Sequence, residues 1–185
     1  MAKTKGVALI SRLDLLKTSY GQEGLDAVLA AMKPQNSELL NNVLFSGWYD
    51  AEIYKDLNKS IKKVLGPKEP MIMEKIGELT AEASMKGVYS AKLKENNVRL
   101  TLDRAASLWR AFHDSGDLEI EVSETENRAI MRVKDYPLPH KEFCDNLVGW
   151  GRRLISLSGG ENAQLKEVRC VCKGAPYCEM IATWD

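Results

Sequence analysis

The spacing of apolar residues changes along this chain from a helical period to a strand period, and this change constrains the fold more than any other feature. Up to about residue 115, apolar residues recur every three or four positions, as Ile72 and Ile76 do. Beyond residue 116 they alternate with charged residues, as Leu118 and Ile120 do. We therefore expect an α+β fold with N-terminal helices packed on a small antiparallel sheet.

Glycine and proline divide the helical half into segments. The short apolar run 7–10 is compatible with either a strand or the first turn of a helix. The expected helical segments that follow are 25–33, 36–45, 49–65, 72–87 and 102–113.

The last 70 residues predict a hairpin, a helix and a second hairpin. Alternation predicts strands over 118–122 and 130–133, and again over 168–172 and 178–184. Between these hairpins, apolar residues at steps of four and three predict a helix over 143–157. We expect a single domain, 1–185, in which residues 1–115 are mainly helical and residues 116–185 contain the two hairpins.

Composition excludes several classes of function. Lys and Arg total 26 and so do Asp and Glu, so no net positive charge would draw the chain to nucleic acid or to an anionic membrane. No apolar run is long enough for a membrane span, and the N-terminus has no secretory signal. We expect a cytoplasmic protein.

Four cysteines lie near the C-terminal end, too few for a disulfide scaffold. Thiolates and carboxylates that converge in fours bind zinc, and the candidates are Cys144, Glu167, Cys170 and Cys178. A three-residue loop in the last hairpin would place Cys170 directly opposite Cys178. Glu167 can join them only if the strand begins near Val168 or has a bulge there.

Two other interpretations of the cysteines stay open at this point. Cys170 and Cys178 are equally compatible with small, buried core residues, because free cysteine is among the most buried side chains. Cys172 lies on the same strand face as Cys170 and is a possible ligand in place of Glu167.

The segment from Glu167 to Cys178, which contains Glu167-Val-Arg-Cys170 and Gly174-Ala-Pro176, resembles the closing signature of the 4-vinyl-reductase-type family, with Cys144 before it. That family includes the sensor domains of phenol- and xylene-responsive activators. The resemblance covers about 40 residues and implies that Cys144, Glu167, Cys170 and Cys178 hold a zinc ion. Four protein ligands would saturate the ion, so its role would be structural.

The resemblance also implies a fold related to haem nitric-oxide sensors and to vesicle-tethering transport-particle subunits, and a homodimer. In the positions where the aromatic sensors have a His and a Trp for phenol recognition, this chain has Glu95 and Ser123.

A hydrophobic ligand would need an apolar pocket between helices and sheet. Its candidate lining consists of Trp48, Tyr49, Met85, Tyr89, Trp109, Phe112 and His113, each of which is also compatible with plain core. His113 is the only candidate for a haem axial ligand. Because the Tyr-x-Ser-x-Arg signature of the nitric-oxide sensors is missing, we do not expect haem.

These observations favour a non-enzymatic, zinc-stapled sensor module that binds a small hydrophobic ligand and reports to a signalling partner. The first alternative is a protein–protein scaffold or tether without ligand, like the transport-particle subunits. The second is an accessory role in tetrapyrrole reduction. We expect no enzyme, because the sequence has no nucleophile with a base, no carboxylate pair and no phosphate-binding loop.

Overall fold

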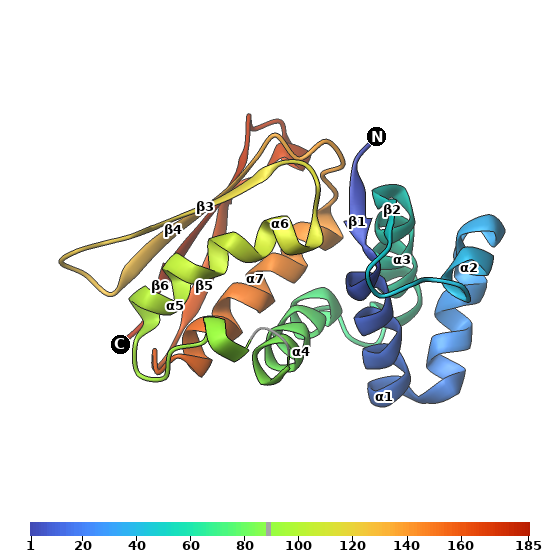
Figure 1. The fold of residues 1–185 in the computed structure, drawn as a ribbon, viewed down its shortest axis with the longest axis horizontal. Helices are drawn as coiled ribbons and strands as arrows, with labels where there is room; N and C mark the ends of the chain where they lie inside the picture. The colour runs from blue at the N-terminus through green and yellow to red at the C-terminus, as the bar shows by residue number, and fades with distance from the viewer. Residues whose placement is uncertain (88–89) are drawn as a thin grey trace.

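The computed structural model describes residues 1–87 and 90–185 of the chain. Helices and an antiparallel sheet are both present, so the α+β expectation is confirmed (Figure 1). In chain order the elements are β1 (Lys3–Lys5), α1 (Gly6–Ala31), α2 (Pro34–Leu40), β2 (Trp48–Asp50), α3 (Ala51–Leu65), α4 (Ile72–Lys86), η1 (Ser90–Lys92), α5 (Val98–Ala105), η2 (Ala106–Leu108), α6 (Trp109–Phe112), β3 (Asp117–Val122), β4 (Arg128–Lys134), α7 (Lys141–Leu157), β5 (Gln164–Arg169), η3 (Val171–Lys173) and β6 (Cys178–Thr183).

The N-terminal region consists of α1, α2 and α3, joined by a small sheet that sequence analysis missed. The run 7–10 belongs to α1, which is interrupted at Gly21, where φ is 70°. Glycine tolerates that left-handed conformation at no steric cost. Strand β1 pairs antiparallel with β2. Each of these strands has three residues, too few for an alternating pattern to be recognised.

Helices α4 and α7 cross at very short distance because each has a glycine at the contact. A Cβ atom on Gly149 of α7 would lie 1.8 Å from the backbone oxygen of Glu74. A Cβ on Gly77 of α4 would lie 2.0 Å from the backbone oxygen of Asn146. Both distances are far below van der Waals contact, so this crossing requires glycine at both positions.

The main sheet has the strand order β3-β4-β6-β5, with every pair antiparallel. Both expected hairpins are present, and α7 connects them across one face, together with α5 and α6 (Figure 1). The opposite face is charged: Arg132 pairs with Glu121 at 2.9 Å and Lys134 with Glu119 at 2.7 Å. The sheet is therefore apolar toward the helices and polar toward solvent.

The terminal hairpin differs from the expected three-residue loop. Strand β5 ends at Arg169, Cys170 precedes the helical turn η3, and Cys178 pairs in register with Val133 of β4. The last pair of the β5–β6 ladder is Arg169 with Glu179, so Cys170 and Cys178 occupy the next position of this register, just beyond the ladder and as expected. The expected irregularity near Val168 is confirmed, because the β5–β6 register shifts between Glu167 and Arg169.

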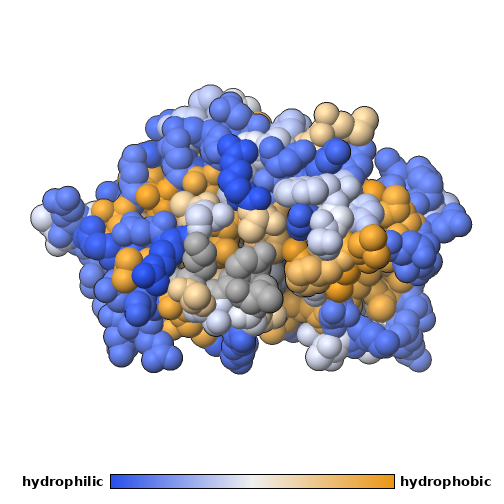
Figure 2. Space-filling view, in the orientation of Figure 1, coloured by the Kyte–Doolittle hydropathy of each residue, from blue (hydrophilic) through white to orange (hydrophobic). Residues whose placement is uncertain are grey.

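Two clusters of buried side chains form the core: one beneath α1, α3 and α4, the other between α5, α7 and the sheet. Figure 2 shows hydrophobic surface over the α1 and α2 region. Leu44 and Phe45, in the segment between α2 and β2, are 70% and 55% exposed. Among the helices of the described residues, none is both long and apolar enough to cross a membrane.

Candidate functional site

A cavity of about 80 Å³ lies where the N-terminal helices meet α5, α6 and α7. Most of its wall is apolar and aromatic, which is typical of ligand pockets, and a few polar groups face it. Its described lining residues are Ala8, Ser11, Arg12, Tyr54, Thr80, Ser84, Ala105, Leu108, Trp109, Phe112, His113, Leu118, Phe143, Asn146, Leu147 and Trp150.

His113 is the buried histidine of this wall. It follows α6, and its backbone bridges to Thr4 of β1, which fixes the ring between the two halves of the chain. Burial lowers the pKa of His113 to about 4, so the imidazole is neutral at pH 7. Within the described structure its buried Nδ1 atom has no hydrogen-bond partner.

Arg12 is the cation of the cavity, and its side chain is only 2% exposed. Its guanidinium donates to the hydroxyl of Tyr54 and lies over the same ring, 5.2 Å from the ring centre. With the Asn146 amide oxygen turned toward it, Arg12 Nη1 also donates to that oxygen at 3.1 Å, and Gly77 N donates to the same oxygen at 2.9 Å. The cation thus has uncharged partners on α3 and α7.

The residues expected to line a pocket lie in different places. Trp109, Phe112 and His113 line the cavity. Trp48 is 40% exposed and Met85 belongs to the core beside the sheet, so neither lies on the cavity wall. The remaining two are Tyr49, whose hydroxyl accepts a hydrogen bond from Leu44 N, and Tyr89, which lies outside the described residues.

Sequence analysis missed other residues of the wall, among them Arg12, Tyr54, Asn146 and Trp150. A signal for Arg12 was present in the sequence. It lies three residues after Leu9 and four before Leu16, so on a helix all three share one face. A charged residue in the middle of an apolar helical stripe indicates a buried ion with a special role.

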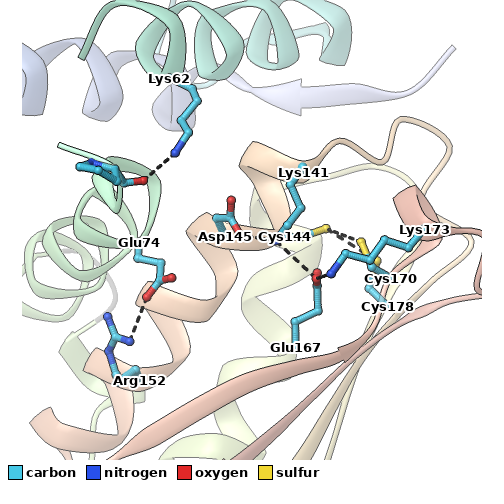
Figure 3. A network of polar contacts seen from close by, with 11 residues as sticks. Lys62, Glu74, Lys141, Cys144, Asp145, Arg152, Glu167, Cys170, Lys173 and Cys178 are labelled. Carbon is cyan, nitrogen blue, oxygen red and sulfur yellow. Dashed lines mark hydrogen bonds and ion pairs between the residues drawn. The ribbon is translucent and has the colours of Figure 1, made fainter. Parts of the chain in front are cut away.

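The predicted metal ligands form a second cluster, which Figure 3 shows at the start of α7 and the end of β5. The sulfur of Cys144 lies 3.7 Å from the sulfurs of both Cys170 and Cys178, and all three side chains are buried. Cys172 is exposed, although its sulfur lies within 4.8 Å of those of Cys144 and Cys170. The chain therefore gathers the thiols, and their role as ligands stays a prediction.

The three buried thiols differ in pKa because of their hydrogen bonds and their burial. The pKa of Cys144 is raised and that of Cys178 is lowered to about 6, because Cys144 donates to the Cys178 sulfur. Burial raises the pKa of Cys170 to about 12.

Glu167 lies beside the thiols but is engaged by two lysines. Its Oε2 atom is 3.3 Å from Lys141 Nζ and 3.2 Å from Lys173 Nζ (Figure 3). Its Oε1 atom is buried without a hydrogen-bond partner in the described structure. Burial alone would raise the pKa of the Glu167 carboxyl. The hydrogen bonds from Cys170 and the two lysines outweigh burial and hold this pKa below its ordinary value.

Comparison with known proteins identifies a shared fold. No family model matches the sequence, and no curated protein matches it. Similar solved structures include H-NOX proteins from K. algicida (12% identity, TM-score 0.66, 98% of this chain and 96% of that chain), from S. oneidensis in an Fe(II)NO state (14%, 0.68, 98% and 99%) and from T. tengcongensis (13%, 0.70, 98% and 97%). Identities this low show likeness of fold alone.

These findings bear on two expectations. The resemblance to the 4-vinyl-reductase-type family is supported by no family model, whereas the related fold of haem sensors is confirmed. We expected structural zinc and no haem, but the structures that share the fold are Fe(II) and haem proteins. On this comparison the expectation of zinc without haem is wrong.

Proposed function

We propose that this chain is a sensor domain that binds a small molecule in the cavity between its N-terminal helices and its C-terminal half. The observation that supports this proposal best is the wall itself, which is mainly apolar and partly aromatic yet contains a neutral buried histidine and a buried arginine. Such polar groups in an apolar wall orient a ligand and select it. A ligand between the two halves could also change how the halves pack, as a sensor requires.

The proposed role is binding, not catalysis. Among the described lining residues of the cavity there is no carboxylate or thiol, and no hydrogen bond within the described structure joins Ser11 or Ser84 to a histidine or a carboxylate. Acyl transfer and hydrolysis need a nucleophile held by a base. The polar groups present here, Arg12, Tyr54, His113 and Asn146, are suited to hydrogen bonding and charge pairing.

Haem is a second candidate ligand, and the fold likeness together with His113 favours it. A neutral imidazole with a free ring nitrogen is the usual axial ligand of haem iron, and Arg12 could pair with a propionate. When bound, haem would supply an iron atom that takes gaseous ligands. A volume of about 80 Å³ is small for a tetrapyrrole, so haem would have to widen the cavity.

The experiment has two arms on the purified chain. The first records the visible absorption spectrum before and during titration with haemin, for wild type and His113→Ala. The second measures melting temperature with butyrate, butyramide and benzyl alcohol, because a ligand that binds the folded state raises it. A Soret band that needs His113, or a melting shift with any of the compounds, supports the proposal; neither result in well-folded protein contradicts it.

Ala8→Leu is the variant that links binding to the cavity. Ala8 lines it from α1 and is half-buried, so a larger side chain should fill the space. Ala30→Leu is the matched control, because Ala30 is an exposed residue of the same helix. Loss of binding in the first variant but not in the second would assign the ligand to this cavity.

The scaffold and tetrapyrrole-reduction alternatives stay predictions, as do the homodimer and the signalling partner. The scaffold alternative would need a filled core, whereas this core has a cavity at the junction of its two halves. We therefore place ligand binding first.

A further inference from the structure

Arg12 is a buried cation for which the described chain provides no counterion. Its side chain is 2% exposed, and no carboxylate of residues 1–87 or 90–185 lies within ion-pair distance of it. The ion pairs that the helices form lie at or near the surface, such as those of Arg152 with Glu74 and Glu78. An arginine this deeply buried is normally paired with a carboxylate or a phosphate.

The partners of Arg12 solvate its charge without neutralising it. Tyr54 and Asn146 are uncharged, and they occupy only some of the five N–H donors of a guanidinium. His113, on the same wall, is neutral at pH 7 and adds no negative charge. The cavity therefore has a net positive charge in a low-dielectric surrounding, which strengthens attraction for an anion.

The Tyr54 hydroxyl and the unused N–H donors of Arg12 can both hydrogen-bond an anion in the cavity. The Tyr54 oxygen accepts from Arg12, so its own O–H proton is free to be donated to a third group. The remaining guanidinium donors are arranged as a planar fork that matches a carboxylate in two parallel hydrogen bonds. Much of the rest of the wall, including Trp109 and Phe143, is apolar and matches a hydrocarbon chain.

From this arrangement we propose that the cavity binds a small monocarboxylic acid, with its carboxylate on Arg12 and Tyr54 and its hydrocarbon chain against the aromatic wall. The inference rests on the proposed function and specifies its ligand class. A cavity of about 80 Å³ admits a chain of a few carbon atoms, so butyrate is the first probe.

The test compares butyrate with butyramide, which has nearly the same shape but no charge. Isothermal titration at pH 7 should give wild type an affinity for butyrate at least about tenfold above that for butyramide, the effect of one charge-assisted pair. This comparison needs no variant. In Arg12→Met, checked for folding by circular dichroism, butyrate should lose that advantage while butyramide binding is kept, and Arg12→Lys should retain some of it.

The outcomes separate this inference from the proposed function. Equal affinities for acid and amide in wild type, or a butyrate advantage that survives in Arg12→Met, would overturn the carboxylate assignment and leave a ligand-binding cavity. If neither compound binds and the chain also takes up no haemin and no benzyl alcohol, the proposed function itself fails. A butyrate advantage that depends on Arg12 supports both.

Discussion

The imidazole of His113 lies against the indole of Trp109, with ring centroids 4.6 Å apart, and both rings line the same cavity. The rings of Tyr136 and Phe143 enclose the imidazole from other sides, at 5.4 and 5.5 Å. This aromatic enclosure removes water from the ring, which explains why its neutral form is favoured.

Acid should destabilise the chain through His113. Its pKa falls from 6.5 unfolded to about 4 folded, so the unfolded state binds the proton first as pH falls. The contribution of neutral His113 to the free energy of unfolding is complete above pH 6.5, and it is lost as pH falls from 6.5 to 4. At pH 5 the loss should be about 2 kcal/mol of unfolding free energy.

Urea denaturation of wild type and His113→Phe at pH 7.5 and pH 5 measures this effect. His140, whose pKa is also lowered by burial, is present in both proteins and cancels in the comparison. The variant should lose about 2 kcal/mol less than wild type between the two pH values. An identical pH dependence in both would show that His113 is not buried as described.

Alanine at the glycine contacts of α4 and α7 should destabilise the fold although alanine favours helix. In Gly149→Ala the new methyl would meet the backbone of Glu74 at 1.8 Å, so the helices must separate. We expect a loss of about 3 kcal/mol, as for overpacked cores. Ser156→Ala, on the exposed face of α7, is the control and should change stability little. Thermal or urea unfolding checks both, and equal stabilities would contradict the close crossing.

Arg152 should couple α7 to α4 by a measurable ion pair. Its Nη1 atom lies 2.9 Å from Glu74, and its Nη2 atom lies 2.6 Å from Glu78. A double-mutant cycle with Arg152→Met and Glu78→Gln should give about 1 kcal/mol of coupling, reduced in about 1 M salt. The exposed pair of Lys86 and Glu82, at 3.9 Å, should give almost none. Coupling no larger than in this control pair would contradict a direct contact between Arg152 and Glu78.

The four cysteines should differ sharply in reactivity. Cys172 is exposed, whereas Cys144, Cys170 and Cys178 are buried. Iodoacetamide followed by mass spectrometry should therefore modify one site in native protein and four in denaturant. In Cys172→Ser the fast modification should vanish. Rapid modification of Cys178 in that variant would mean that the thiol cluster opens to solvent.

The sequence predicted those elements whose pattern is long enough to be periodic. Helix α7 and strand β3 were placed nearly to the residue because their apolar spacing continues over several turns or several alternations. Strands β1 and β2, with three residues each, exist because they pair with one another, and pairing between segments so far apart in sequence leaves no local trace. The three buried thiols were brought together as their spacing suggested, with Cys170 and Cys178 at facing positions just beyond the last ladder pair, although the strands end sooner than expected and η3 forms the turn.

The candidate cavity was harder to predict because its polar residues come from separate helices. Arg12, Tyr54 and Asn146 lie on α1, α3 and α7, and only the packed structure joins them. Each one taken alone is compatible with an ordinary helix position. They become candidate binding residues because all three are buried beside one cavity, which depends on the packed fold and not on any single segment.

The most direct test of ligand binding in the cavity is the nuclear magnetic resonance of the four tryptophan indole N–H groups. Trp109 and Trp150 line the cavity, whereas Trp48 and Trp184 do not. Titration with butyrate, butyramide, benzyl alcohol and haemin should shift or broaden the Trp109 and Trp150 signals for at least one compound and leave the other two signals in place. Signals that stay unchanged with every compound, or that change only at Trp48 and Trp184, would contradict ligand binding in this cavity.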